Sequence, residues 1–467
     1  MNRKEHLSVS AAQRCVLEVV SALGTEHVGL ERALGRVLAE EVRANRDQPP
    51  YDISAMDGYA LRSADLGNIP AVLEIVEDIK AGDRPSKTLA PGQCARIMTG
   101  APLPPGADAV IRVEDTGAVF AETLTPNSGE TTSHSTKPAS GQVAGYLPQA
   151  GERDAASQRE PVANAVRINQ SVKPGNDVRR LGGNMRNGEL VLAPGTEITP
   201  GVVGVLATVK RAQVQVYRRP RVAILSSGDE LEGLDEPVDP NRIPDANSYT
   251  LMAQVQALGI EPVLLGIARD DPDELARYLG RGLDHDVLLV SGGTSVGVHD
   301  YVRPTLEALG VQMLFWRVAM KPGHPVAFGR VTPTPAKTAA PAGAFVFCLP
   351  GNPVSSMVCF EEFVAPALRR MMSHARIHRH TITARLTHNV KHQPGRTEFI
   401  RVLLAQEEGG YAATSTGAQD SGMLLSMARA DGLAILPADC NGLAAGSMVT
   451  VQLLDGTAFQ DDAGFKE

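Results

Sequence analysis

Four turns in the second half of the sequence carry the residue types that could bind an anion. They span 226–230, 269–271, 291–301 and 350–356, and each follows an apolar run typical of a β-strand. Glycine in such turns lets backbone N–H groups approach an oxyanion closely, and hydroxyl groups add donors. One such turn is usually ordinary loop chemistry, whereas four at one sheet edge indicate an anion site. The candidate binding residues are Ser227, Gly228, Gly292, Gly293, Thr294, Ser295, Pro350, Gly351, Asn352 and Pro353.

Carboxylates gather at the same turns and predict a divalent cation beside the anion. Glu230, Asp270 and Asp300 would repel a phosphate unless a cation lay between them. Magnesium is the natural candidate for this metal site, because it binds few carboxylates together with substrate phosphates and water. Arg317 and Lys321 follow in a basic segment and could neutralise the anion directly. The alternative for these two residues is a solvated charge at the end of a strand.

The elements that would position these turns alternate between strands and helices. Strands are expected at 221–225, 263–267, 286–290 and 345–349, and helices from 247 and from 272 to about 280. Asp271, Pro272 and Glu274 supply a capping residue, a first-turn proline and a third-position carboxylate for the second helix. The alternation predicts an α/β domain over 218–372, with a mostly parallel sheet and helices on both faces. Ligands of such sheets bind beyond the carboxyl ends of the strands, where these turns lie.

The flanking regions have shorter, strand-like patterns. The segment 1–217 is expected to be a split N-terminal region, with a helix at 10–23 and a β-rich lobe that includes strands at 72–76 and 109–113. Two segments poor in large apolar groups, 122–166 and 332–343, are expected to be insertions, the first of them flexible. A C-terminal β domain is expected over 373–467, with strands at 381–386, 398–404, 411–415 and 448–453. The fold class is therefore multidomain α/β plus β.

Composition excludes several classes of protein. A length of 467 residues exceeds one core, and 43% hydrophobic with 21% charged residues is typical of a globular chain. The net charge of −8 argues against nucleic acid as a partner, because phosphate contacts need clustered Lys and Arg. The five scattered cysteines include no Cys-x-x-Cys, and no stretch approaches the ~18 apolar residues of a membrane span. We expect a cytoplasmic protein without membrane association.

Seven short motifs occur in an order that resembles one known family. They are SAMDGYA from Ser54, RIMTGAP from Arg96, SSGDEL from Ser226, RDDP from Arg269, SGGTSVGVHDY from Ser291, KPGHPVAFG from Lys321 and LPGNPVSS from Leu349. Together they resemble the molybdopterin molybdenumtransferase family, the MoeA-type proteins that include the E domain of gephyrin. The resemblance covers nearly the whole chain apart from the two insertions.

The resemblance implies an enzyme that inserts molybdenum from molybdate into adenylylated molybdopterin, with Mg2+ and with release of AMP. It also implies a homodimer, a C-terminal domain like a β-barrel, and the molybdopterin adenylyltransferase as a partner that supplies the substrate. The implied catalytic residues are Asp57, Glu230, Asp270, Asp300 and Lys321, and the implied substrate contacts include Thr99, Arg317, Arg401 and Ser421. Arg401 and Ser421, taken alone, are also ordinary surface features of a strand and a loop.

Two positions depart from the pattern of the family. Asn184 stands where some members carry an acid, and Arg317 stands where a lysine is common, which exchanges a point donor for a planar fork. Two other functions remain open. One is the preceding adenylyl transfer from ATP to molybdopterin, which would need only the α/β module. The other is a scaffold that binds a partner peptide, which would have no need of clustered acids.

Overall fold

The computed structural model describes residues 4–120, 161–293, 301–331 and 343–454. The chain divides into two compact units, of which the first comprises Met1–Glu41 with Ala193–Glu467 and the second comprises Val42–Leu192. The first unit contains the α/β sheet and the C-terminal β domain. The second unit contains the β-rich lobe.

A seven-stranded sheet forms the centre of the first unit. Its strand order is β1 (Lys4–Leu7), β19 (Val311–Val318), β21 (Ala327–Val331), β22 (Phe345–Leu349), β18 (Val287–Ser291), β14 (Val222–Ser227) and β17 (Val263–Ala268). The four strands β22, β18, β14 and β17 are parallel, as predicted. The strand β21 runs antiparallel to both of its neighbours, and the sequence did not predict this reversal. The sheet is therefore mixed, with its carboxyl-end turns gathered beside β14, β18 and β22.

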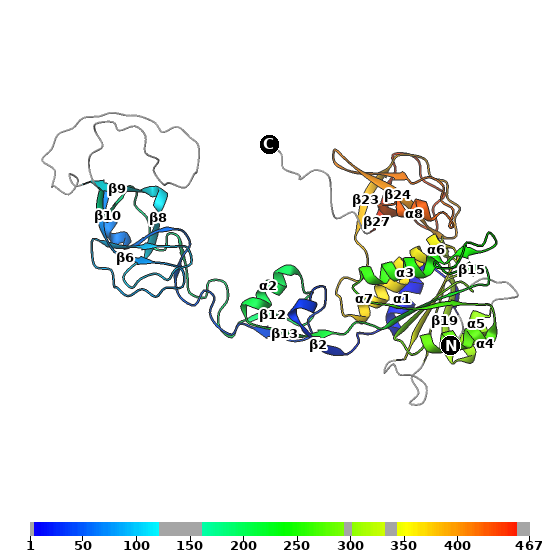
Figure 1. Cartoon of the computed structure of the whole chain (residues 1–467). Coiled ribbons are helices and arrows are strands. Elements are labelled where there is room, and N and C mark those ends of the chain that lie inside the picture. Colours follow the sequence, from blue (N-terminus) through cyan, green and yellow to red (C-terminus); the bar gives the residue numbers. More distant parts are fainter. Residues whose placement is uncertain (1–3, 121–160, 294–300, 332–342, 455–467) are drawn as a thin grey trace. The chain divides into compact units, whose positions relative to one another are not determined.

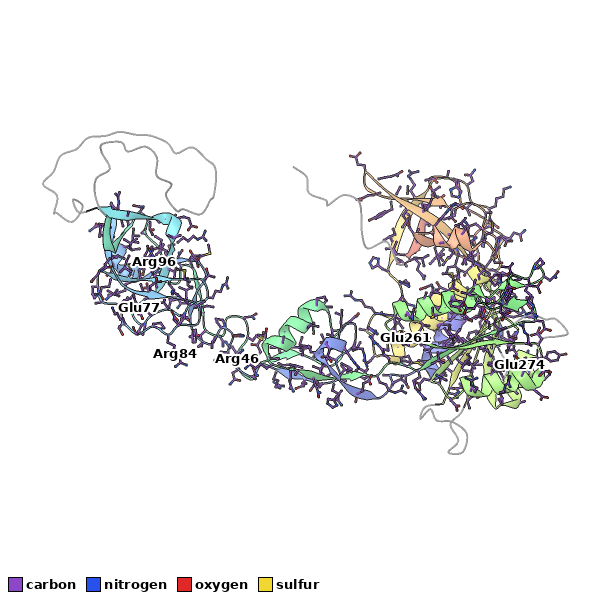
Figure 2. All side chains as sticks on the ribbon, viewed as in Figure 1. Arg46, Glu77, Arg84, Arg96, Glu261 and Glu274 are labelled. Carbon is purple, nitrogen blue, oxygen red and sulfur yellow. The ribbon has the colours of Figure 1, made fainter. Side chains whose placement is uncertain are left out.

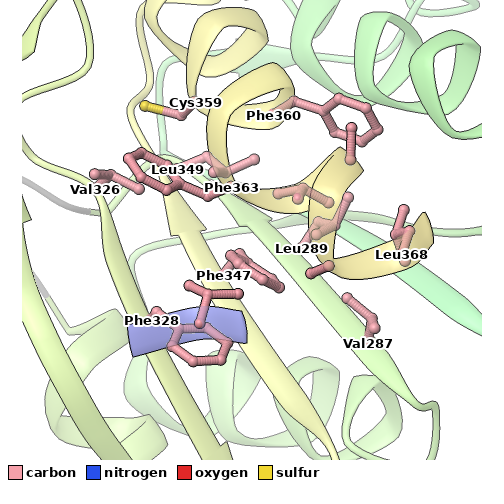
Figure 3. Close-up of a cluster of buried hydrophobic side chains, with 14 of the residues drawn as sticks. Val287, Leu289, Val326, Phe328, Phe347, Leu349, Cys359, Phe360, Phe363 and Leu368 are labelled. Carbon is pink, nitrogen blue, oxygen red and sulfur yellow. The ribbon is translucent and has the colours of Figure 1, made fainter. Parts of the chain in front are cut away.

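Helices cover both faces of this sheet (Figure 1). One face carries α1 (Val9–Val19), α3 (Ala246–Ala257), α6 (Pro353–Cys359) and α7 (Ala365–Met371), and the other carries α4 (Pro272–Gly282) and α5 (Val302–Ala308). Figure 3 shows the core under the first group, where the rings of Phe328 and Phe347 on neighbouring strands lie 4.7 Å apart. The predicted cap of α4 is present, because the Glu274 N–H donates to Asp271 Oδ1 at 2.8 Å.

The beginning of the chain contributes a strand to this sheet. The strand β1 pairs in parallel with β19, and Ala12 and Val16 of α1 are fully buried in the core of the sheet. The helix is capped by Ser8 and ends at Val19, so it starts and ends earlier than predicted. A four-residue edge strand is too short for its period to be recognised in a sequence. The rest of this region in the first unit is α2 (Pro200–Thr208) and the pair β2 (Thr25–Gly29) and β13 (Gln213–Tyr217).

The second unit is built on a six-stranded sheet. Its order is β8 (Ala109–Arg112), β5 (Gly58–Leu61), β7 (Gln93–Ile97), β6 (Ala71–Ile79), β10 (Pro161–Ile168) and β9 (Thr116–Phe120). Two-stranded pairs join β4 (Ile53–Ser54) to β11 (Val178–Arg179) and β3 (Val42–Arg43) to β12 (Leu190–Leu192). The strand β10 occupies the end of the segment predicted as a flexible insertion. Val166 and Ile168 are buried on one face of it, and their burial stabilises the strand. The polar residues that precede them hide this apolar pattern in the sequence. The remainder of that segment, and nearly all of 332–343, lie outside the described residues.

The C-terminal domain is a closed five-stranded barrel, as the resemblance implied. Its strands are β23 (Thr381–Leu386), β24 (Thr397–Glu407), β25 (Gly410–Ser415), β26 (Gly432–Leu436) and β27 (Met448–Leu453), and pairing of β24 with β26 closes the ring. The strand β26 was not predicted. A short strand, β20 (Met320–Lys321), leaves the α/β sheet and pairs with β24, and α8 (Leu424–Ala428) contacts α6. These contacts join the barrel to the α/β sheet within one unit.

Candidate functional site

A cavity of about 1050 Å³ lies at the carboxyl ends of β14, β18 and β22. Most of the predicted binding residues that the structure describes line it. They are Ser227, Gly228, Glu230, Asp270, Gly292, Gly293, Arg317, Pro350, Gly351, Asn352 and Pro353. The geometry thus brings together turns that are up to 126 positions apart in the sequence, from Ser227 to Pro353.

Close backbone contact between two turns explains the glycine at position 292. Gly292 has a φ of 93°, and a Cβ atom placed on it would lie 2.3 Å from the carbonyl oxygen of Ser227. Its N–H donates to the carbonyl of Leu349 at 3.2 Å, so β22 also takes part in this contact. Any side chain at position 292 would push the turns after β14 and β18 apart. Glycine is therefore needed for the shape of the cavity floor.

Asn247 connects two of these turns through hydrogen bonds, and the sequence analysis did not include it among the site residues. Its Nδ2 atom donates to Ser291 Oγ and to the carbonyl of Gly351, both at 2.7 Å. Asp245, the cap of α3, is buried and accepts from Ser226 Oγ at 2.8 Å and from the Ser248 N–H at 3.1 Å. A capping aspartate at the start of the helix predicted from position 247 was the available signal. These bonds fix the start of α3 against the anion-binding turns.

Arg269 is a second positioning residue that was not predicted as part of the site. One guanidinium nitrogen, Nη1, donates to the carbonyls of Gly228, Asp229 and Leu231 at 3.3, 3.1 and 2.8 Å. Three carbonyls converging on one cation hold the turn in a fixed conformation. The turn that carries Glu230 is therefore tied to the turn that carries Asp270.

The acids of the cavity lie close enough to affect one another. Burial raises the pKa of Asp270, and the charges of Asp229 and Glu230 raise it further. Ser227 Oγ donates to Asp270 at 3.3 Å and opposes this shift only in part. In the part of the chain that the structure describes, these acids form no ion pair with a basic side chain. Such a group of carboxylates fits a divalent cation, and Mg2+ is a cation that binds through few carboxylates. Among the described residues no group of three His, Cys, Asp or Glu side chains could hold a metal ion by itself.

Lys321, Arg401 and Ser421 have different surroundings from those expected. Lys321 does not line this cavity, and its Nζ atom lies 2.8 Å from Glu398 Oε1. Arg401 is fully buried, and its guanidinium donates to Ser426 Oγ and to the carbonyls of Ala418, Gln419 and Asp420 at 3.0–3.3 Å. Burial among carbonyls makes Arg401 a support for the loop that carries Ser421. Ser421 Oγ accepts from Asn352 Nδ2 at 2.9 Å, so it reaches the rim of the cavity.

Asp57 and Thr99 form a separate pair in the second unit. The backbone N–H and the hydroxyl of Thr99 both donate to Asp57 Oδ1, each at 2.7 Å. These two bonds lower the pKa of Asp57, the backbone bond more than the hydroxyl. Both side chains are exposed, so the SAMDGYA and RIMTGAP motifs present an ionised carboxylate on the surface of this unit.

Three models of protein families match consecutive parts of the chain. They are the MoeA N-terminal region (domain I and II) at residues 7–209, a "Probable molybdopterin binding domain" at 223–370 and the MoeA C-terminal region (domain IV) at 383–454. A molybdopterin molybdenumtransferase of Nostoc sp. is 35% identical, over 91% of this chain and 88% of its own length. The Bacillus subtilis molybdopterin molybdenumtransferase is 31% identical, over 97% and 95%. The chain belongs to the molybdopterin molybdenumtransferase family.

Solved structures of the same family agree with this fold. A MoeA protein of Pyrococcus horikoshii has a TM-score of 0.72 and 26% identity, and the match covers 96% of this chain and all of that one. A second structure from that organism has a TM-score of 0.70 and 28% identity. The predicted combination of α/β sheet, β-rich lobe and C-terminal barrel is thereby confirmed.

Three of the predicted site residues, Thr294, Ser295 and Asp300, lie outside the described residues. The two departures from the pattern can be located. Arg317 is half-buried in β19 and lines the cavity, whereas Asn184 is exposed in the second unit. No helix in the described part of the chain is long and apolar enough to cross a membrane.

Proposed function

We propose that this chain is a molybdopterin molybdenumtransferase, which inserts molybdenum from molybdate into adenylylated molybdopterin and releases AMP. The single observation that carries the proposal is the cavity at the carboxyl edge of the sheet, where Glu230 and Asp270 lie beside the glycine-containing turns. A substrate with a phosphoanhydride needs hydrogen-bond donors for its phosphate oxygens. It also needs a positive charge that offsets the negative charge of its phosphates. The cavity offers both, in a chain whose relatives carry the name of this activity.

The residues of the cavity divide the work in this proposal. The backbone N–H groups beside Gly292 and Gly293 bind phosphate oxygens, and Arg317 neutralises their charge. Glu230 and Asp270 would hold Mg2+, and the ion would supply a positive charge that offsets the negative charge of the substrate. Asp300 is the third metal ligand that the family pattern suggests.

Asp57, Thr99 and Lys321 have further roles in this proposal. The Asp57 carboxylate is held by Thr99 and stays ionised, so it can accept hydrogen bonds or contact a cation. Lys321 and Ser421 would contact molybdate. We also propose a cytoplasmic homodimer that receives its substrate from the adenylyltransferase, and sedimentation velocity tests the dimer.

Release of AMP is the direct test. Purified protein, adenylylated molybdopterin, Mg2+ and molybdate should together yield AMP above a control without protein, and omission of Mg2+ should abolish the yield. The Asp270→Asn variant should lower the rate by about 100-fold, because it removes a negatively charged ligand of the metal ion. Asp273→Asn is the matched control, since Asp273 is an exposed acid in the first turn of α4.

The two alternative functions give different results in the same assay. Consumption of ATP with molybdopterin, independent of molybdate, would indicate the adenylyltransferase. No AMP release by the wild-type protein, with growth dependent on molybdenum enzymes undisturbed by Asp57→Ala and Asp270→Ala, would favour a scaffold and reject the proposal.

A further inference from the structure

A second cavity lies at the opposite edge of the same sheet. It has a volume of about 600 Å³ and is formed by the segments that lead into β14, β17 and β18. Figure 2 labels Glu261, on the wall of this cavity, and Glu274, and the two lie at opposite ends of β17. The cavity is therefore separate from the site proposed for the transferase.

Arg219 lines this cavity and lacks a partner for its charge. In the described part of the chain, its guanidinium makes no hydrogen bond or ion pair, although its Nε atom is buried from solvent. Its neighbours in sequence are different, because Arg218 donates to both oxygens of Asp286 at 2.7 and 3.0 Å, and Arg221 Nε lies 3.6 Å from the same carboxylate. A buried donor without an acceptor costs about 1–3 kcal/mol. The arrangement favours an external acceptor.

The surroundings of Arg219 increase its excess of positive charge. Burial lowers the pKa of Arg219, and the nearby Arg36 lowers it further, against an opposing effect of Glu26. Glu26 forms its ion pair with Arg36, so it does not neutralise Arg219. Both effects would be relieved by an anion within reach of the guanidinium.

A role for Arg219 as a cap of α3 does not explain its position. The guanidinium lies over Gly259, where a Cβ atom would be 2.8 Å from Arg219 Nη2. An arginine at the end of a helix can donate to the last carbonyls. Here the carbonyl of Gln256 accepts from the Gly259 N–H at 2.8 Å, and that of Val255 accepts from Leu258 and Ile260. Backbone groups satisfy these carbonyls, and Arg219 adds nothing to them.

The other walls of the cavity combine charge with apolar surface. Arg221 and His285 add basic groups at the mouth, and Glu261 is the acid among the lining residues, where its side chain accepts from Gln256 at 3.1 Å. Pro220, Val222, Ile260 and Val263 form an apolar wall, on which Val263 is 48% exposed. Val222 and Ile260 are themselves buried, so a phosphate group alone would leave mainly the side chain of Val263 in water.

We infer that this cavity binds a phosphate monoester, with the phosphate on Arg219 and Arg221 and its apolar group against Val263 and Ile260. The guanidinium fork of Arg219 would make paired hydrogen bonds to two phosphate oxygens. The volume of about 600 Å³ accommodates a ligand of the size of an aryl or nucleoside monophosphate. The site stands independently of the transferase proposal, since it shares no lining residue with the first cavity.

Calorimetric titration of the full chain with phenyl phosphate and with inorganic phosphate tests the site. Phenyl phosphate should bind more tightly than inorganic phosphate, and Arg219→Met should weaken its binding by about tenfold or more. Arg277→Met is the matched control, because Arg277 is an exposed arginine on α4 that does not line the cavity. Release of AMP in the transferase assay should be unchanged in Arg219→Met.

Thermal unfolding separates a binding role from a structural one. Without anion, Arg219→Met should be as stable as the wild type or more stable, and phenyl phosphate should raise the Tm of the wild type only. A lower Tm of the variant without anion, with the phosphate-induced rise retained, would make Arg219 a structural residue and overturn the proposal. Equal affinity for phenyl phosphate and inorganic phosphate would overturn the proposal of a monoester ligand, because the cavity would then bind a free oxyanion equally well.

Discussion

The two edges of the α/β sheet handle charge in opposite ways. At the carboxyl edge, Asp270 lies with Asp229 and Glu230, and burial together with these neighbours raises its pKa. At the opposite edge, where the parallel strands begin, burial also opposes ionisation of Asp286. Arg218 and the N–H of Arg221 outweigh this effect, so the pKa of Asp286 is lowered. Among the described residues, Asp270 forms no ion pair, whereas Asp286 has two arginine partners. Asp286 therefore stabilises the fold, whereas the charge of Asp270 costs stability at the carboxyl edge.

The largest effect should come from a change that closes the first cavity without touching its charges. In Gly292→Ala, the new Cβ would meet the Ser227 carbonyl at 2.3 Å in a backbone conformation with φ of 93°. We expect a loss of about 3 kcal/mol in the free energy of unfolding. Displacement of the turns by even 1 Å should lower AMP release by about 100-fold. Urea unfolding and the AMP assay measure the two effects.

A matched glycine in the same unit distinguishes this effect from a general cost of alanine. A Cβ on Gly280 in α4 meets no atom within 4 Å, so Gly280→Ala should gain about 0.5–1 kcal/mol as a helix substitution. Its AMP release should stay at the wild-type rate. Full activity in Gly292→Ala would show that the contact between the turns does not shape the site.

The next effect tests the stabilising aspartate at the amino edge. Asp286→Asn leaves Arg218 without a counter-charge, and we expect a loss of about 2 kcal/mol at pH 7, less than for a fully buried pair because Arg218 is 25% exposed. Since the folded pKa is below 3.8, the contribution of Asp286 is complete above pH 3.8 and disappears as pH falls through the folded pKa. Urea unfolding of both proteins at pH 7 and at pH 3 should show a difference that shrinks in acid. The exposed Asp284→Asn should lose little at either pH.

Predictability from sequence differed between the strands and the contacts between turns. The buried strands β14, β18 and β22 are uninterrupted apolar runs, so their ends and the turns beyond them could be predicted. The edge strand β1 and the reversed strand β21 could not, because pairing direction and edge position depend on partners far along the chain. Glu230 and Asp270 were predicted from residue type and position alone.

The residues that hold the turns of the cavity in place could not be predicted from the sequence. Arg269 and Asn247 act through carbonyls that become neighbours only in the folded chain. Arg401 was expected at the substrate because of the family pattern, yet its guanidinium is enclosed by the loop 418–426. Lys321 was expected beside the carboxylates and instead pairs with Glu398 through the short strand β20. A strand that leaves one sheet for another cannot be recognised from the period of its residues.

The smallest effect has the opposite sign and sharpens the comparison most. Because the folded pKa of Asp270 is raised, the charged form costs stability at pH 7, and Asp270→Asn should raise the free energy of unfolding by less than about 1 kcal/mol, since Asp270 is only half-buried. The gain should fade as pH falls through the folded pKa and then through 3.8, because the folded and the unfolded carboxyl groups both become protonated. Urea unfolding from pH 7 to pH 4 measures it, with Asp273→Asn as the control. A destabilised Asp270→Asn protein would mean that Asp270 supports the fold as Asp286 does, and the contrast between the two edges would fail.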